Sequence, residues 1–169
     1  FKVHLSNNES YESKAVILAY GKVPAQLNIS GEDKFFGRGI HIYAVYDAPL
    51  FKDKVVAVIG GGNSALDSTL ILSKYAEKVY LIHKRNEFRG EQVLQDKVKN
   101  LKNVEIIFEN VPFEFKGNDK LKSLIIKNIN NNELREINID GCFVEIGYMN
   151  KVDFVKDLVD VNEKNEIII

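Results

Sequence analysis

A glycine-rich turn is the part of this sequence whose residue types and spacing most clearly point to chemistry. It is a G-x-G-x-x-A run formed by Gly60, Gly61, Gly62, Asn63, Ser64 and Ala65. Five apolar residues, 55–59, precede it as a candidate buried strand, and a helical apolar pattern follows it. This strand–turn–helix context is typical of dinucleotide-binding sites, in which the helix start and its free N–H groups hold phosphates. The turn therefore predicts a pyrophosphate site.

Each small residue in the run has a physical role. Gly60 lets the chain turn tightly off the strand, and Gly62 lets the backbone approach a pyrophosphate without a Cβ in the way. Ala65 keeps the helix packed closely against the strand. The alternative is a glycine-rich turn that holds no ligand.

A basic cluster follows the second predicted strand, residues 78–83. An NAD site usually has Asp or Glu at the end of this strand, to accept the ribose hydroxyls. This chain has instead the cluster His83, Lys84, Arg85 and Arg89. Cations attract a 2′-phosphate and arginine matches its oxygens, so two arginines could favour NADPH over NADH by roughly one to three powers of ten. The pattern predicts an NADP(H) site, and the alternative is a solvated basic loop.

Composition excludes several other classes. The 169 residues could form one domain or one and a half, and a net charge of −1 with a pI of about 6.4 gives no reason to expect nucleic acid. No apolar run approaches a membrane span and no signal peptide is present, so a cytoplasmic protein with no membrane contact is expected. No metal site is expected, and the single cysteine, Cys142, excludes an internal disulfide.

The remaining pattern predicts an α/β fold, namely a Rossmann-like parallel sheet with an inserted three-stranded antiparallel meander. A helix over 91–101 and a parallel strand over 104–108 follow the basic cluster, and residues 142–146 supply a further parallel strand. Turn residues separate the three meander strands, which are expected at 111–116, 121–127 and 134–139.

The ends of the chain are expected to be strands that need neighbours. Residues 1–5 and 14–20 have strand patterns around a polar turn, and the chain finishes on the apolar triplet 167–169. We therefore expect a piece of a longer protein. Between these ends, 22–39 is expected to be an irregular linker, 39–45 a short strand, and Asp47 an N-cap that accepts backbone N–H groups before Pro49.

Several segments together resemble low-molecular-weight thioredoxin reductases and their flavoprotein relatives. KAVILAYG, from residue 14, looks like the family's strand ending in A-T-G, and GEDKFFGRGI looks like its connector. VVAVIGGGNSALDS resembles its NADPH fingerprint, HKRNEFR its 2′-phosphate loop, and GCFVEIGY the strand that leaves its NADPH domain. The fingerprint combined with H-K-R-x-x-x-R is much more specific than either alone.

The resemblance implies an NADPH domain inserted into a split FAD domain. Residues 1–21 and 148–169 would be FAD-domain remnants and 22–147 the NADPH-binding domain. The fingerprint residues would contact the pyrophosphate, the cluster from His83 to Arg89 would surround the 2′-phosphate, and Gly147 would lie near the hinge and the nicotinamide. The family's two flavin-binding glycine motifs are not in this chain, so FAD is expected only in the full-length protein, which is expected to be a homodimer.

The departures from the family are as informative as the matches. Thioredoxin reductases have C-x-x-C followed by Asp before the fingerprint strand, where this chain has Tyr43-Ala44-Val45-Tyr46-Asp47. A phenol cannot exchange disulfides, so dithiol chemistry by the usual route is excluded. Asp47 could be the family's acid, but its capping role suffices. Cys142 is expected to be a small buried hydrophobe.

Three functions stay open from the sequence. The first is an NADPH domain that passes hydride to FAD, with electrons going directly from flavin to a small redox protein or small-molecule acceptor, as in ferredoxin–NADP reductases of this type. The second is a thioredoxin-disulfide reductase with its dithiol elsewhere. The third is a non-catalytic NADPH-binding regulatory module. The retained nucleotide pattern and the lost cysteines favour the first.

Overall fold

The computed structural model describes residues 1–163 and 165–168. The chain divides into two compact units, of which one comprises Pro24–Tyr148 and the other comprises Phe1–Val23 with Met149–Ile169. The short strands β3 (Val23–Pro24) and β12 (Tyr148–Met149) pair with each other where the chain passes from one unit to the other. The assignment of the outer segments to an FAD domain stays a prediction.

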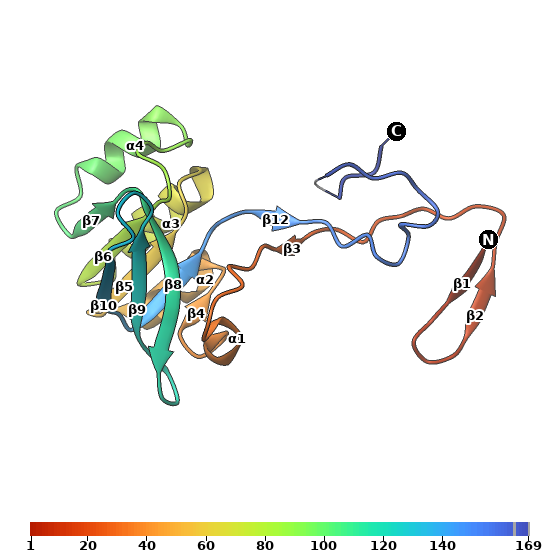
Figure 1. The fold of residues 1–169 in the computed structure, drawn as a ribbon, viewed down its shortest axis with the longest axis horizontal. Coiled ribbons are helices and arrows are strands. Elements are labelled where there is room, and N and C mark those ends of the chain that lie inside the picture. Colours follow the sequence, from red (N-terminus) through yellow and green to blue (C-terminus); the bar gives the residue numbers. More distant parts are fainter. Residues whose placement is uncertain (164, 169) are drawn as a thin grey trace. The chain divides into compact units, whose positions relative to one another are not determined.

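A five-stranded parallel sheet forms the centre of the Pro24–Tyr148 unit (Figure 1). Its strand order is β4-β11-β5-β6-β7. The bounds of these strands are Ile40–His41 for β4, Val55–Ile59 for β5, Lys78–Ile82 for β6, Val104–Ile107 for β7 and Gly141–Val144 for β11. The predicted Rossmann-like sheet is confirmed, and β11 ends two residues earlier than the sequence pattern indicates.

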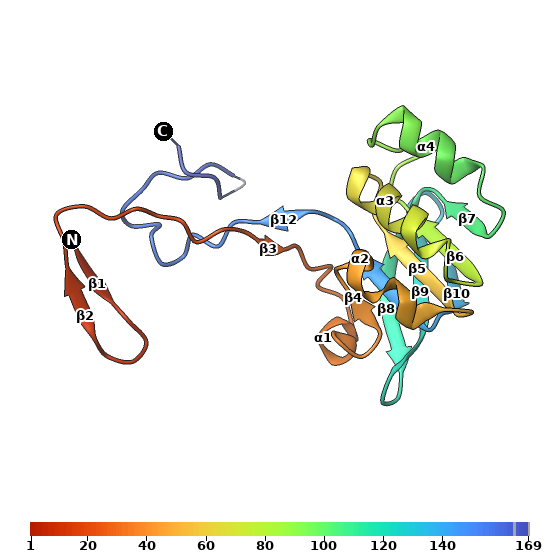
Figure 2. The same cartoon turned by 180° about the vertical axis from the view of Figure 1, so that it is seen from behind.

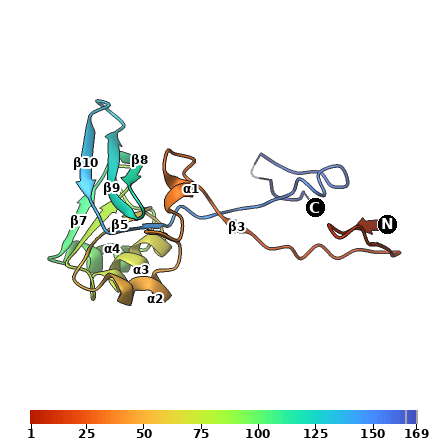
Figure 3. The same ribbon diagram turned by 90° about the horizontal axis from the view of Figure 1, so that it is seen from below.

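Two kinds of layer cover the two faces of this sheet. Figures 2 and 3 show helices α3 (Asn63–Leu72) and α4 (Gln92–Lys99) on one face and an antiparallel meander on the other. The meander has the order β10-β9-β8, and its strands are Asn110–Gly117 for β8, Leu121–Asn128 for β9 and Leu134–Asn138 for β10. It is inserted between β7 and β11, as the sequence predicts.

Strand β5 shows why this sheet is apolar on both faces. Val56 and Val58 pack in the core under the helices, with Leu66 and Leu81. Ala57 and Ile59 point to the opposite core, under the meander. A strand that is covered on both sides has no polar face, and each fully buried Val or Leu side chain contributes about 1.5–3 kcal/mol.

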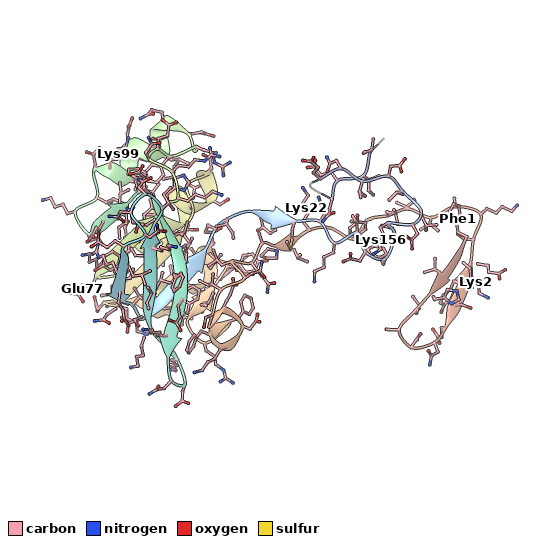
Figure 4. The ribbon with its side chains drawn as sticks, in the orientation of Figure 1. Phe1, Lys2, Lys22, Glu77, Lys99 and Lys156 are labelled. Carbon is pink, nitrogen blue, oxygen red and sulfur yellow. The ribbon has the colours of Figure 1, made fainter. Side chains whose placement is uncertain are left out.

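The N-terminal segment differs from the sequence prediction. The hairpin there joins β1 (Lys2–His4) to β2 (Ser10–Glu12), and every residue of both strands is exposed, including Lys2 (Figure 4). The predicted strand at 14–20 is wrong, because no strand in the described residues pairs with it and Ile17 is 92% exposed. An apolar run becomes a strand only where a neighbour takes its backbone hydrogen bonds. Near the other end, Ile167 forms one bridge with Val161, and Ile169 lies outside the described residues.

The segment before β5 also differs from the prediction. The expected strand at 39–45 is reduced to β4, and the linker before it contains the short helix α1 (Glu32–Phe35). Helix α2 (Ala44–Asp47) and the 3₁₀ helix η1 (Ala48–Phe51) follow β4. Asp47 stands at the N-cap position of η1, as predicted, but its side chain makes no capping hydrogen bond, so the expectation that it accepts backbone N–H groups is wrong. Its Oδ2 lies 2.7 Å from His41 Nδ1 instead, and this pair ties α2 to β4.

Candidate nucleotide-binding site

Three chain positions meet at the carboxyl edge of the parallel sheet. Ile59, Ile82 and Val144 are partners in register across β5, β6 and β11. The next residues are therefore neighbours: Gly60 after β5, His83 after β6 and Glu145 after β11. The Gly60 N–H donates to Ile82 O at 3.0 Å and the Glu145 N–H to Ile59 O at 2.8 Å, which fixes their positions. In open α/β sheets, ligands bind at this edge.

A cavity of about 510 Å³ opens at this edge. The glycine turn from Gly60 to Ser64 forms its floor, His83, Lys84 and Arg89 come from the second strand and its loop, and Glu145 to Gly147 follow β11. The ends of β5 and β6 add Ile59 and Ile82. The loop after β3 and the start of β8 complete the lining with Gln26, Leu27, Ile29, Asn110, Val111 and Pro112. The volume lies within the usual range for a small-molecule or cofactor site.

The three glycines differ in what surrounds them. A Cβ on Gly60 would lie 2.4 Å from Glu145 O, and its φ of +151° is one that other residues rarely adopt. A Cβ on Gly61 would lie 2.4 Å from the His83 ring, whereas Gly62 has nothing within 4 Å. Gly60 and Gly61 are therefore required by packing alone. The open space at Gly62 leaves a cradle that a Cβ would fill, which fits the expected pyrophosphate.

The start of α3 lies beside this open space. No side chain in the described part of the chain caps this helix, so its first N–H groups are available to a ligand. The Asn63 side chain is used within the protein, because its Oδ1 accepts the Glu91 N–H at 2.7 Å. The Arg89 N–H donates to Gly61 O at 2.8 Å. These bonds hold the basic loop against the glycine turn. Ala65 is fully buried behind the turn and does not line the cavity.

The structure separates the four basic residues predicted after β6. Lys84 and Arg89 line the cavity, whereas exposed Arg85 is not among its lining residues. His83 is 4% exposed, stacks on Phe88, and its Nε2 has no hydrogen-bond partner. Burial, followed by the charges of Arg89 and Arg85, lowers the pKa of His83. The lowered pKa favours the neutral form of His83 in this part of the cavity wall, and its place beside a 2′-phosphate stays a prediction.

Glu145 is a cavity residue that the sequence analysis missed. Its Oε1 accepts the Ser68 hydroxyl at 2.6 Å, which connects the end of β11 to the buried face of α3. Burial raises the pKa of Glu145, and the Ser68 hydrogen bond opposes that rise. The sequence did contain a signal for Glu145, namely an acidic residue directly after the last parallel strand, β11. The contacts from 26–29 and 110–112 had no local signal, since they depend on how distant segments fold together.

The region expected to hold a dithiol has no thiol. Tyr43, Val45 and Tyr46 are exposed on α2 and at its start, with the two tyrosine rings 6.4 Å apart, edge to face. Cys142 is fully buried in β11, as predicted, and burial raises its thiol pKa far above the ordinary value. A buried neutral thiol of this kind is not a redox nucleophile.

The described residues lack two other features. None of their helices is both long enough and apolar enough for a membrane crossing. They also contain no group of three or more His, Cys, Asp or Glu side chains placed to hold a metal ion.

The parallel sheet with its helices and inserted meander places the chain in the class of proteins with a Rossmann-like α/β fold. The chain belongs to the pyridine nucleotide-disulphide oxidoreductase family, whose sequence profile matches residues 1–169. This family uses FAD and NAD(P)H, and within it the chain is thioredoxin reductase-like but lacks the cysteine pair.

Named relatives support this placement. The chain is 38% identical over 164 residues to thioredoxin reductase of Borreliella burgdorferi, covering 96% of this chain and 50% of that protein. It is 32% identical over 171 residues to thioredoxin reductase of Rickettsia prowazekii, covering 99% of this chain and 55% of that protein. The crystal structure of Lactococcus lactis thioredoxin reductase in the FR conformation matches with a TM-score of 0.88 and 30% identity, over 98% of this chain and 55% of that one. The chain thus spans about half the length of each of these relatives.

Proposed function

We propose that this chain is the NADPH-binding part of an FAD-dependent oxidoreductase and binds NADPH across the carboxyl edge of its parallel sheet. The observation that carries the proposal is the joining of an open glycine turn, a helix start and two cations in one cavity. Together they match two parts of the nucleotide. Gly62 and the first N–H groups of α3 would hold the pyrophosphate, and Lys84 and Arg89 would hold the 2′-phosphate.

The preference for NADPH follows from the charge beside β6. A carboxylate at this position would accept ribose hydroxyls and repel a 2′-phosphate, but buried, neutral His83 occupies it. Lys84 and Arg89 then supply the positive charge that NADH cannot use. Arg85 would contribute through its longer-range field, because it does not line the cavity.

The residues of this chain bind and orient the nucleotide. When bound, NADPH supplies a hydride and FAD accepts it. Gly60 and Gly61 keep the turn closed against Glu145 and His83, so the open position at Gly62 faces the ligand. Gly147, with a φ of +98°, lies at the cavity rim and would let the chain bend past the nicotinamide end.

Electrons would leave the flavin without a dithiol from this chain. Tyrosines stand in place of the cysteine pair, and the one thiol is buried in β11. The acceptor would then be a small redox protein or a small molecule that meets the flavin directly. Reduction of thioredoxin is the second candidate, because the relatives above are named for it. It requires a dithiol supplied from outside these 169 residues.

Arg89→Ala tests the proposal. Loss of a charge-assisted contact costs about 1.5–3 kcal/mol, so NADPH affinity should fall by about 10- to 100-fold while NADH affinity stays within about twofold. Isothermal titration calorimetry measures both. Arg85→Ala is the matched control, since it removes an equal charge outside the cavity lining, and its effect should be smaller. Equal losses for NADPH and NADH in the Arg89 variant would contradict the 2′-phosphate assignment.

A further inference from the structure

Glu145 is the one acidic side chain among the cavity-lining residues of the described chain. It lies directly after β11, while the cations Lys84 and Arg89 follow β6. Strand β5 with the glycine turn stands between these two strands in the sheet order. The cavity therefore has a positive end and an acidic end, separated by the floor of backbone N–H groups.

This order of strands fixes which half of a dinucleotide meets the acid. If the 2′-phosphate lies at the cations after β6 and the pyrophosphate lies over the turn after β5, the rest of the molecule extends toward β11. That remainder is the nicotinamide riboside. Its ribose hydroxyls and its carboxamide N–H₂ are hydrogen-bond donors, and a carboxylate only accepts.

The Glu145 carboxyl group is held in place for such a contact. Its Oε1 accepts the Ser68 hydroxyl at 2.6 Å, and Ser68 is itself buried on α3. The backbone of Glu145 is fixed by its N–H bond to Ile59 O. A side chain held at both its backbone and one oxygen loses little further freedom when it binds a ligand.

We propose that the Glu145 carboxylate accepts hydrogen bonds from the nicotinamide riboside and so selects the complete dinucleotide over adenine-nucleotide fragments. Ser68 acts as a positioning residue for it. This inference rests on the proposed NADPH site. It adds a residue that recognises the reactive half of the nucleotide, at the end opposite the 2′-phosphate.

The test compares two ligands that share the 2′-phosphate, NADP⁺ and 2′,5′-ADP, which lacks the nicotinamide riboside. In the full chain, Glu145→Ala should lower NADP⁺ affinity about tenfold and leave 2′,5′-ADP affinity within about twofold. Glu145→Gln keeps an acceptor oxygen and the Ser68 contact, so it should recover most of the NADP⁺ affinity. The unchanged 2′,5′-ADP affinity shows that the variants are folded.

Glu136→Ala is the matched control. Glu136 accepts the Ser123 hydroxyl at 2.5 Å in the meander, a similar Ser–Glu pair that does not line the cavity. Glu136→Ala should leave the affinities for NADP⁺ and for 2′,5′-ADP unchanged. Equal losses of both ligands in Glu145→Ala, or no loss of either, would overturn the inference and assign Glu145 a purely structural role. Failure of the unaltered chain to bind either ligand would instead overturn the proposed NADPH site.

A third ligand identifies the donor. Nicotinic acid adenine dinucleotide phosphate has a carboxylate in place of the carboxamide. If the carboxamide is the partner, the unaltered chain should bind this analogue at least tenfold more weakly than NADP⁺, and Glu145→Ala should narrow the difference. If Glu145→Ala lowers both affinities equally, the ribose hydroxyls are the partner.

Discussion

The carboxyl edge of the parallel sheet and the α2 region lie in one compact unit but differ in how tightly their residues are confined. At the sheet edge, a Cβ on Gly60 or on Gly61 would lie 2.4 Å from a neighbouring atom. At α2, Val45 and Tyr46 are 69% and 79% exposed, and the segment is tied to β4 by the His41–Asp47 contact. The first region holds the residues of the proposed nucleotide site, and the second has tyrosines where the family has its two thiols.

If the sheet edge binds NADPH as proposed, the nucleotide site and the position of the family's dithiol are separable within this fold. The glycine turn depends on close packing at Gly60 and Gly61, where an added side chain would meet neighbouring atoms. A dithiol depends on two exposed side chains, which can be replaced without repacking. If the two regions are independent, a change in one should leave the other unaltered.

Gly61→Ala and Gly62→Ala should affect different quantities, the first the stability of the fold and the second the affinity for NADPH. The added methyl on Gly61 meets the His83 ring, so overpacking should lower the free energy of unfolding by about 1–3 kcal/mol. The methyl on Gly62 meets no protein atom but fills the expected pyrophosphate position, so NADPH affinity should fall about tenfold or more at unchanged stability. Denaturant unfolding and calorimetric titration measure the two effects. Loss of stability in Gly62→Ala would show that the cradle is a packing feature.

Lower pH should destabilise the sheet edge through His83. Burial and the nearby arginines hold the pKa of His83 below its ordinary value of 6.5, so the folded state binds this proton less tightly than the unfolded state. The contribution of neutral His83 to the free energy of unfolding is fully present above pH 6.5. It is lost as the pH falls from 6.5 toward the lowered pKa. Urea unfolding at several pH values should therefore show less pH dependence in His83→Gln than in the unaltered chain. An unchanged profile would mean that His83 titrates freely.

The sequence predicted the parts of the site that depend on local order. The strand, the glycine turn and the helix are contiguous from Val55 to Leu72, so their pattern is readable directly. The place of Glu145 in the cavity was missed because its partner, Ser68, is 77 residues away. The burial of His83 against Phe88 has no local signal in the sequence, because it depends on tertiary packing.

The same distinction explains the errors in the fold. Residues 14–20 have a strand composition, but a strand also needs a partner, which the composition does not contain. Asp47 precedes Pro49 in a capping pattern, yet its carboxylate lies 2.7 Å from His41 on β4 and caps no backbone N–H group. The meander strands were predicted correctly because each is followed by a turn and pairs with its sequence neighbour.

Asp47→Ala should loosen α2 without affecting the sheet edge. It removes the 2.7 Å contact with His41, which is partly buried, so the free energy of unfolding should fall by about 0.5–1.5 kcal/mol. Hydrogen exchange should increase in residues 44–51, and NADPH affinity should stay unchanged. Val45→Ala, a truncation of an exposed residue on the same helix, is the control and should change neither. A fall in NADPH affinity would show that α2 and the nucleotide edge are coupled.

The smallest expected effect on the nucleotide is that of Tyr43→Cys with Tyr46→Cys. Both tyrosines are exposed, and the Tyr46 N–H donates to Tyr43 O at 3.3 Å, a turn that keeps the two positions close. The replacement should create an oxidisable dithiol, detected by thiol titration, and leave NADPH affinity within about twofold. In a full-length protein that contains FAD, this dithiol should exchange electrons with the flavin and add disulphide reduction to the unaltered reaction. A disulphide that forms but never exchanges with flavin would show that this segment does not correspond to the C-x-x-C of the thioredoxin reductases. A changed NADPH affinity would show that the α2 region and the nucleotide edge are coupled.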